Sequence, residues 1–568
     1  MKISSLGKDR KTWQWIGQNL VGEKHKLVIL CILHILQGIV LTSISLSLKK
    51  VVDAAVSGDE HLLLECLPLP VTLVISEILL YAAIKYLSGI FLARAEIAFR
   101  NRAFAALMLR AYDKVTLVHS GDWTGRIISA SRIIAQNVQR LLPEVAGICT
   151  QLISAVVALH FILPGSTLVV LAAMALMLVC ASFLRGNLVK YHQAIQMRDS
   201  RACGMLQEQI AGLAVIRSYS GEDQAIRLMR SEFGRVQKAR KDWTGYITVC
   251  SGGIHAAAQL GFLLGVVVCC FSVRNGTITL GTLTAIVSLV QQLSTPLSGL
   301  FGIIPQYYAI ISSSQILHNI DQLPTDTTQT PMSAQEVRHF WKTKLRGFGM
   351  RDVSFSYDNK EMVLETFSLD IRKGEFVALM GGSGAGKSTI LKLLMGLYKP
   401  SRGSIYLRTL SDSEQPLDAS MRRMFAYIPQ ENGLLSGTIR EGVCLGDQEK
   451  IQDDRKIRTA LENACAWDFV SELDKGIDSE LGERGFGLSE GQMQRLAVAR
   501  ALLAERPVLI LDEATSALDA ETERKLLENL KALQDVTIIA VTHRPAAMEV
   551  ADRVINLERL SSLESSSS

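Results

Sequence analysis

The sequence contains 568 residues, of which 48% are hydrophobic and 20% are charged, and its mean hydropathy is +0.22. This length exceeds what one hydrophobic core organises, so two or more domains are expected. The net charge of +5 is small, and no pattern of basic and aromatic residues predicts a nucleic-acid partner. The ten cysteines show neither a disulfide framework nor metal-ligand spacing.

Apolar segments dominate the N-terminal half. Residues 1–26 are basic but lack the small-residue cleavage site of a signal peptide. Six later segments are long and apolar enough to cross a bilayer, and helices are the expected form because lipid offers no partners to backbone polar groups. The six predicted spans are Leu27–Leu48, Leu67–Leu92, Leu142–Leu163, Leu168–Leu184, Ile247–Val273 and Leu280–Ile304. The lipid bilayer is therefore a predicted partner.

The connections between these spans indicate the orientation of the chain. Arg and Lys are concentrated between the second and third spans and between the fourth and fifth, whereas the other connections are short or acidic. The positive-inside rule then places both basic connections, the N-terminus and the C-terminal half in the cytoplasm. A cell membrane is the predicted location, with the cytoplasmic membrane of a bacterium as the first choice.

The two basic connections are longer than loops need to be and have helical patterns, so the membrane helices are predicted to continue below the bilayer. Each connection contains a break suited to a short crosswise helix, at Ser120–Gly125 and at Ser218–Glu222. These breaks are predicted contact surfaces for the soluble half of the chain. The alternative is that they are surface turns of a coiled stalk.

Several polar residues lie inside the predicted spans. Glu77, Tyr81 and Lys85 recur every four residues and therefore share one face of a helix. Such residues are candidates for a transport path, although for any single one an interhelical hydrogen bond is the favoured interpretation. The further candidates are His34, Gln37, His255, Gln259, Gln291 and Gln292.

The composition divides the chain into four parts. Residues 1–320 form the predicted six-helix membrane domain, and residues 321–346 are a polar, turn-rich linker. Residues 347–560 are predicted to form a soluble α/β domain, and the serine-rich end, 561–568, is predicted to be disordered.

A glycine-rich loop follows a short apolar strand that ends at Met380, and a helix follows the loop. This is the P-loop pattern in its strand–loop–helix context, where backbone N–H groups and the helix N-terminus bind phosphate. Lys387 is predicted to reach the β- and γ-phosphates of ATP, and Ser388 to bind Mg²⁺. The loop residues are Gly381, Gly382, Ser383, Gly384, Ala385, Gly386, Lys387, Ser388 and Thr389.

Polar residues end three further predicted strands. The continuous apolar run 508–511 is typical of a buried parallel strand and ends in Asp512 and Glu513, at the edge where such sheets bind ligands. Asp512 suits the Mg²⁺ shell and Glu513 suits a general base that polarises the attacking water; the alternative is two solvated acids. Gln430 and His543 end two other strands, and His543 is predicted to contact the γ-phosphate.

The pentapeptide 488–492 predicts a contact with another molecule. Ser489 and Gln492 form a capping-box pattern that opens a helix predicted to end at Leu503. The positive end of that helix is an anion site suited to a phosphate held by another molecule. Together with the P-loop, this motif predicts a dimer driven by nucleotide.

In order along the chain, these motifs resemble those of the ATP-binding cassette (ABC) family. The likeness also includes Tyr357 upstream of the P-loop, the segment Ser516–Asp519 after the acids, and Gly482–Gly485 before the pentapeptide. With six spans and long cytoplasmic extensions, the whole chain resembles a half-size ABC exporter of the type I (type IV) fold. Two positions depart from the family pattern, since Glu490 and Gly442 stand where Gly and Asn are usual.

The resemblance implies roles for individual residues. Tyr357 would stack on adenine, Gln430 would sense the metal and the membrane domain, and His543 would hold the γ-phosphate. Gln430 would also join Ser388 and Asp512 around Mg²⁺, and Glu513, His543 and Gln430 would form the catalytic set. The pentapeptide 488–492 corresponds to the signature of the family. The residues expected to face the nucleotide from the signature and from the segment Ser516–Asp519 are Ser489, Gly491, Gln492 and Asp519.

The implied function is ATP-driven export of a hydrophobic, lipidic or peptide substrate by a homodimer with two composite ATP sites. ATP and Mg²⁺ are the implied cofactors, and ATP hydrolysis coupled to transport is the implied reaction. Two alternatives stay open: one half of a heterodimeric exporter, and an ATP-gated channel or regulatory membrane protein built on the same fold.

Overall fold

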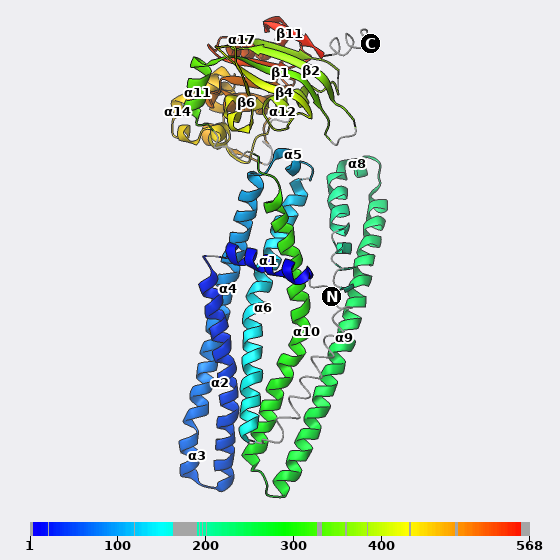
Figure 1. The fold of residues 1–568 in the computed structure, drawn as a ribbon, viewed down its shortest axis with the longest axis vertical. Coiled ribbons are helices and arrows are strands. Elements are labelled where there is room, and N and C mark those ends of the chain that lie inside the picture. Colours follow the sequence, from blue (N-terminus) through cyan, green and yellow to red (C-terminus); the bar gives the residue numbers. More distant parts are fainter. Residues whose placement is uncertain are drawn as a thin grey trace. The chain divides into compact units, whose positions relative to one another are not determined.

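The computed structural model describes residues 4–20, 22–118, 120–162, 190–191, 194–195, 197–199, 201–326, 332–357, 361–382, 384–430, 433–482 and 487–557. The chain divides into two compact units. One unit is Met1–Met108 with Val118–Leu323, and the other is Leu109–Leu117 with Pro324–Ser568. Figure 1 shows that the first is helical and the second mixes helices with strands.

Long helices that run side by side build the helical unit (Figure 1). Among the described residues, its helices are α1 (Ser4–Asn19), α2 (Lys24–Ser57), α3 (Glu60–Cys66), α4 (Pro68–Met108), α6 (Ser120–Ile162), α8 (Leu213–Ser218), α9 (Glu222–Arg274) and α10 (Leu280–Gln322). The 53 residues of α9 span about 80 Å at about 1.5 Å per residue, against about 30 Å for a hydrocarbon core. Helices of this length agree with the predicted extension beyond the bilayer.

Three described helices are long and apolar enough to cross a membrane: Lys24–Ser57, Glu60–Met108 and Gly121–Ile162. They contain the first two predicted spans and nearly all of the third. Shorter apolar stretches, Gln259–Arg274 and Leu280–Gln292, overlap the fifth and sixth. The fourth predicted span lies outside the described residues.

Hydrogen bonds between helices hold α2 against α6 and α10. Thr42 of α2 bonds to Ser154 of α6 with 2.7 Å between the hydroxyl oxygens, and Ser45 bonds to Ser288 of α10 at the same distance. Gln292 Nε2 donates to the Leu41 carbonyl oxygen at 3.1 Å and to Ser45 Oγ at 2.5 Å. In an apolar surrounding such bonds, together with close packing, drive helix association.

Other polar residues of the predicted spans also have partners within this unit. Gln37 Nε2 donates to Glu77 Oε1 at 3.1 Å and so joins α2 to α4. The Lys85 ammonium lies 5.5 Å from the centre of the Tyr81 ring, and His34 Nδ1 lies 3.0 Å from the Leu30 carbonyl oxygen. Gln259 and Gln291 are exposed on their helices, while the His255 side chain lies outside the description. For the Gln37–Glu77 pair, the interhelical interpretation is confirmed.

One predicted break is confirmed and the other is wrong. In the second cytoplasmic connection α8 ends at Ser218 and α9 begins at Glu222, with Ser220 at φ 52° between them. In the first, Ser120–Gly125 forms the first turns of α6, where Asp122 favours the helix N-terminus. The chain breaks earlier instead and forms the short helix α5 (Tyr112–Val115), which packs in the second unit.

Two sheets form the framework of the mixed unit. The five-stranded sheet has the order β11-β3-β10-β9-β6 and is parallel throughout, and the four-stranded antiparallel sheet has the order β2-β1-β4-β5. The strands are β1 (Leu345–Phe355), β2 (Leu364–Arg372), β3 (Phe376–Met380), β4 (Arg402–Thr409), β5 (Glu414–Pro416), β6 (Phe425–Ile428), β7 (Gly437–Thr438), β8 (Glu480–Leu481), β9 (Val508–Asp512), β10 (Thr537–Val541) and β11 (Arg553–Asn556).

Helices cover these sheets. They are α11 (Ala334–Thr343), α12 (Lys387–Leu394), α13 (Ile439–Val443), α14 (Asp454–Asn463), α15 (Trp467–Ser471), α16 (Glu490–Leu503), α17 (Ala520–Lys531) and α18 (Pro545–Val550). Short 3₁₀ helices occur at Ala419–Met424, Cys444–Gly446, Gln448–Lys450 and Gly476–Asp478. The strand predicted to end at Met380 is β3, the predicted run 508–511 is β9, and the strands predicted before Gln430 and His543 are β6 and β10.

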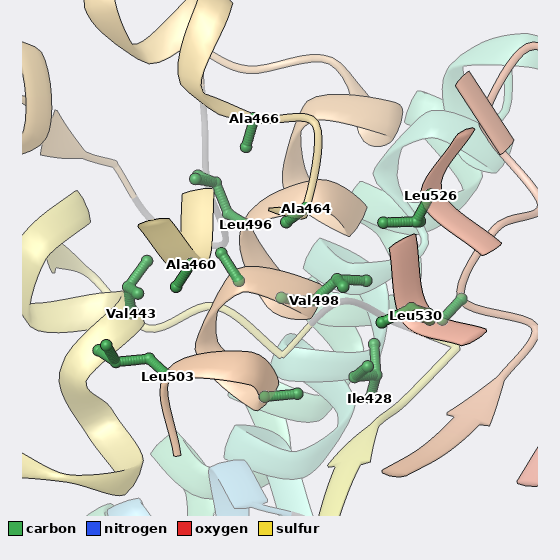
Figure 2. Packing of buried hydrophobic residues seen from close by; sticks show 14 of the residues in the cluster. Ile428, Val443, Ala460, Ala464, Ala466, Leu496, Val498, Leu503, Leu526 and Leu530 are labelled. Atoms are coloured by element: carbon green, nitrogen blue, oxygen red, sulfur yellow. The ribbon is translucent and has the colours of Figure 1, made fainter. Parts of the chain in front are cut away.

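The helix α16 lies at the centre of one hydrophobic core (Figure 2). Leu496 and Val498 of α16 are fully buried in the cluster that also holds Ile428 of β6 and Leu526 and Leu530 of α17. All five residues of β9 are buried as well. The helix that begins inside the pentapeptide is therefore anchored in the core, while its first residues reach the surface.

The start of α10 gives a test of helix packing in the helical unit. Gly281 N donates to Asp53 Oδ1 at 2.9 Å, and a Cβ at Gly281 would collide with the Lys49 carbonyl oxygen and the Asp53 carboxylate. We expect Gly281→Ala to lower the free energy of unfolding by about 1–3 kcal/mol because α10 must move away from α2. The midpoint of thermal unfolding in detergent measures this change.

Gly265→Ala is the matched control for that experiment. Gly265 also lies inside a long helix, α9, but an added Cβ there meets nothing within 4 Å. Alanine is the better helix former, so the midpoint should stay or rise slightly. Equal losses in both variants would contradict the proposed contact between α10 and α2.

Candidate functional site

The parallel sheet brings four predicted strand ends to one edge. Because β3, β10, β9 and β6 are neighbours and run in the same direction, their carboxyl ends align. The residues that follow these ends include the P-loop, His543, Glu513 and Gln430. This edge is where parallel α/β sheets bind ligands.

The P-loop leaves β3 and enters α12. Gly381, Gly384 and Gly386 have φ values of 154°, 86° and 81°, which side chains rarely adopt. The buried Lys387 begins α12, and its Nζ donates to the carbonyl oxygens of Gly381 at 2.6 Å and Gly382 at 2.9 Å. Ser383 lies outside the described residues. The loop thus presents backbone amides, one ammonium group and a helix N-terminus together.

Asp512 is held by two hydroxyl groups. Ser388 Oγ donates to Asp512 Oδ1 at 3.2 Å, and the Tyr427 hydroxyl donates to Oδ2 at 3.0 Å. Burial raises the pKa of Asp512, and the two hydrogen bonds act in the opposite direction. Burial and the neighbouring Asp512 also raise the pKa of Tyr427, which keeps its hydroxyl a donor. The close Ser388 and Asp512 oxygens are the hard ligands that Mg²⁺ prefers.

Tyr427 is a site residue that the sequence analysis missed. It lies in β6, three positions before Gln430, and points from that strand to the neighbouring β9. A polar aromatic residue within a short strand is a weak signal by itself. Only the pairing of β6 with β9 makes its partner evident.

Glu513 meets two of its predicted partners. Gln430 Nε2 donates to Glu513 Oε2 at 2.7 Å, and His543 Nε2 lies 4.0 Å from Glu513 Oε1. The same His543 nitrogen lies 3.2 Å from Lys387 Nζ. Glu513 adopts a φ of 52°, an uncommon backbone conformation that often marks functional positions. The three predicted catalytic residues therefore gather beside the P-loop lysine.

Tyr357 is positioned by the P-loop helix and by other aromatic rings. Its hydroxyl is hydrogen-bonded to Thr389 Oγ1 at 2.9 Å. The rings of Phe355 and Tyr398 lie edge-on to it, with centroids 5.0 and 5.2 Å away. About half of Tyr357 is exposed, so a planar ligand can reach it.

The predicted capping box at the start of α16 is confirmed. Ser489 Oγ accepts from Gln492 N at 3.2 Å, and Gln492 Oε1 accepts from Ser489 N at 2.8 Å. Glu490 is the first residue of the helix and is exposed. Gly491 lies against the following loop, because a Cβ there would be 2.9 Å from the Ala517 carbonyl oxygen.

A second residue missed from the sequence is Gln494. Its fully buried side chain donates to Ser516 Oγ at 3.0 Å and accepts from Ala517 N at 3.1 Å. The segment Ser516–Asp519 is thereby fixed to α16. Asp519 caps α17 by accepting from Thr522 N at 2.9 Å, and this bond lowers the pKa of Asp519.

The groups gathered at this edge determine which ligands the site can bind and which reaction it can support. The P-loop groups favour a polyphosphate anion, the Ser388 and Asp512 oxygens favour a hard divalent cation, and Glu513 is a carboxylate placed to orient water. The capped N-terminus of α16 is a separate, exposed anion site.

Family models match both parts of the chain. Residues 364–516 match the model described as ABC transporter, and residues 27–297 match the ABC transporter transmembrane region. Among curated proteins, ABC transporter B family member 1 of Dictyostelium discoideum is 28% identical over 80% of this chain and 50% of its own length. The ATP-dependent lipid A-core flippase of Vibrio parahaemolyticus is 31% identical over 64% of this chain and 62% of its own.

The chain thus spans half of the first relative and under two thirds of the second. A solved structure titled "Structure of a bacterial Atm1-family ABC exporter with ATP bound" has the same fold, with a TM-score of 0.82 over 94% of both chains at 22% identity. The transmembrane model covers mostly residues of the helical unit, and the other model covers residues of the mixed unit. The matched part of the mixed unit includes the P-loop, the pentapeptide 488–492 and Glu513, whereas Tyr357, Asp519 and His543 lie outside it. This chain belongs to the ABC transporter family, with its transmembrane region and its nucleotide-binding cassette on one polypeptide.

Proposed function

We propose that this protein is one half of an ATP-driven exporter and that it hydrolyses ATP at the edge of the parallel sheet. The observation that carries the proposal is the position of Glu513. Its carboxylate is bonded to Gln430 and lies beside His543, which in turn contacts Lys387. A general base within reach of a phosphate-binding lysine is what phosphoryl transfer to water requires.

Each residue of the site has its own proposed role in binding or hydrolysis of ATP. Lys387 and the N-terminus of α12 bind the β- and γ-phosphates, and Tyr357 supports the adenine ring. Ser388, Asp512 and Gln430 are the residues that would hold Mg²⁺, which neutralises phosphate charge when it is bound. Glu513 orients the attacking water and accepts its proton, while His543 contacts the γ-phosphate.

Two copies of the chain complete the site. The capped and exposed N-terminus of α16, with Ser489, Gly491 and Gln492, supplies an anion site for the nucleotide of the partner copy. A homodimer is proposed because every catalytic position of this chain is occupied by a competent residue. Chemical cross-linking and native mass measurement of the purified chain test it against a heterodimer.

A lipidic substrate is the first to test. Relatives from several bacteria are named ATP-dependent lipid A-core flippase. From these names we propose for this protein only the class of substrate, an amphipathic lipid. ATP-dependent movement of a fluorescent lipid in proteoliposomes would support export. A nucleotide-gated ion current without lipid movement would support a channel instead.

Replacement of the proposed base separates binding from turnover. We expect Glu513→Gln to bind ATP as the native protein does, since the side chain keeps its size, and to lose roughly 10²–10⁴-fold in kcat. Phosphate release in nanodiscs and equilibrium ATP binding measure the two properties. Robust hydrolysis by this variant would overturn the assignment of Glu513.

Gly491 tests the contact between the signature and the loop after the acids. In Gly491→Ala the new methyl group pushes on the Ala517 carbonyl oxygen, so the segment that follows Glu513 must shift. A displacement of this kind lowers kcat by roughly tenfold or more. Gly442→Ala is the control, because its Cβ would make only an ordinary 3.7 Å contact with Leu481. Wild-type kcat in Gly491→Ala would refute the role of this close contact.

Glu490 tests the charge of the signature. Its exposed carboxylate begins the helix that is proposed to face the partner's γ-phosphate. Repulsion of about 1 kcal/mol across water corresponds to roughly fivefold in affinity. We expect Glu490→Gly and Glu490→Gln to bind ATP about that much more tightly and to turn over faster at low ATP. Unchanged binding in both variants would show that the carboxylate points away from the nucleotide.

A further inference from the structure

Arg544 directly follows His543 and connects two loops of the candidate site. Its Nη1 donates to the Leu518 carbonyl oxygen at 2.7 Å, and its Nη2 donates to the Ser516 carbonyl oxygen. Both acceptors come shortly after Glu513 in the chain. The loop that carries His543 is thereby bound to the loop that carries Glu513.

A buried carboxylate holds the guanidinium of Arg544 in place. Glu523 of α17 is 2% exposed, and its Oε2 accepts from Arg544 Nη1 at 2.9 Å. Its other oxygen, Oε1, accepts from Thr515 Oγ1 at 2.7 Å. A buried charge needs such partners, because its transfer out of water without them is strongly unfavourable. Glu523 thus fixes Arg544 and also the chain just after Glu513.

The segment after Glu513 is held from two sides. On one side, Gln494 donates to the Ser516 hydroxyl at 3.0 Å. On the other side, Arg544 donates to the carbonyl oxygen of Ser516. The Ser516 amide in turn donates to the Glu513 carbonyl oxygen at 3.1 Å. A planar guanidinium presents several donors in a fixed geometry, whereas a lysine ammonium is a compact charge on a flexible chain. The backbone beside Glu513 therefore depends on an arginine at position 544.

We propose that Arg544 is a positioning residue for ATP hydrolysis, because its guanidinium fixes the backbone that places the Glu513 carboxylate relative to His543. This inference rests on the proposed function, since it takes Glu513 as the base. Glu513 adopts a φ of 52°, and such a conformation persists only where the surrounding structure enforces it. The side-chain partners of Arg544 lie after Glu513 and in α17 rather than in the P-loop. Loss of Arg544 should therefore slow the reaction without weakening ATP binding.

The alternative role for Arg544 is to compensate the buried charge of Glu523 and nothing more. Removal of one partner from a buried ion pair lowers stability, because the other charge is left uncompensated. Under this alternative, activity must return when the second charge is removed as well. A variant that lacks both charges therefore separates the two roles.

The test uses the full-length protein in nanodiscs and measures three quantities. They are kcat for ATP hydrolysis with Mg²⁺, the dissociation constant of ATP with EDTA, and the midpoint of thermal unfolding. We expect Arg544→Ala to lose roughly 10–100-fold in kcat and to keep the dissociation constant within about twofold. Its unfolding midpoint should fall, because Glu523 loses its partner. A loss of ATP affinity as large as the loss of kcat would overturn the proposal.

Two further variants separate position from charge. In the double variant Arg544→Ala, Glu523→Gln the midpoint should return toward the wild-type value, whereas kcat should stay as low as in Arg544→Ala. Arg544→Lys keeps a charge beside Glu523 but lacks the planar fork, so it should also restore stability more than kcat. Recovery of kcat in step with the midpoint, in either variant, would overturn the proposal.

Arg553→Ala is the matched control within the same unit. Arg553 of β11 is also partly exposed, and its Nε lies 2.8 Å from Oε1 of the mostly buried Glu375. Its Nη2 donates to a backbone carbonyl oxygen, that of Asp370. We expect this variant to lose stability but to keep kcat within about twofold, because its partners lie outside the candidate site. An equal loss of kcat here would overturn the proposal, since loss of stability alone would then explain the effect of Arg544→Ala.

The outcome is separable from that of the proposed function. If the wild-type protein does not hydrolyse ATP, or if Glu513→Gln hydrolyses it robustly, the assignment of the base is wrong and the positioning role falls with it. If Glu513→Gln is inactive and Arg544→Ala keeps the full kcat, only the positioning role fails.

Discussion

The parallel pairing of β3, β10, β9 and β6 is the constraint on which the site depends. The register joins Val541 to Leu379 on one side and to Asp512 on the other, and Ile428 to Leu511. Each strand then ends at nearly the same level, so the next polar residues meet at one edge. A register shift in any one strand would move its residue by about 3.3 Å and turn its side chain to the opposite face. The complete burial of β9 resists such a shift, because it would expose an apolar run.

The helix α16 links this edge to the exposed pentapeptide 488–492, the signature. Its middle is buried in the core while its capped start is exposed. Gln494 holds Ser516, and the Ser516 amide donates to the Glu513 carbonyl oxygen at 3.1 Å. A force on the signature is therefore resisted by the core and reaches Glu513 through two hydrogen bonds. The signature and Glu513, the proposed base, are thus joined within this unit, although the signature is proposed to act on the nucleotide of the partner copy.

Local sequence signals located several structural elements well, because glycines, apolar runs and capping residues act on their own neighbourhood. They placed the P-loop, the strand carrying Asp512 and the capping box of Ser489. Tyr427 and Gln494 escaped, since their partners are fixed by strand pairing and by core packing rather than by spacing. The site of α5 was misplaced for a related reason. A four-residue helix has no periodicity to detect, and the Ser and Gly residues at 120–125 are overridden by the packing of the long helix α6.

In the helical unit, the contacts between the long helices differ between the apolar region and the basic connections. In the apolar region, the buried hydroxyl and amide bonds of α2, α6 and α10 supply attraction that lipid-facing leucines cannot. Nearer the basic connections, ion pairs appear instead: Glu96 of α4 pairs with Arg100 and with Arg132 of α6. Trp15 of α1 donates to Asp321 at the end of α10 at 2.7 Å. The chain enters and leaves α5 directly from α4 and α6, and those helices are tied together by Glu96. Glu96 therefore holds α4 and α6 together near their basic ends within the helical unit.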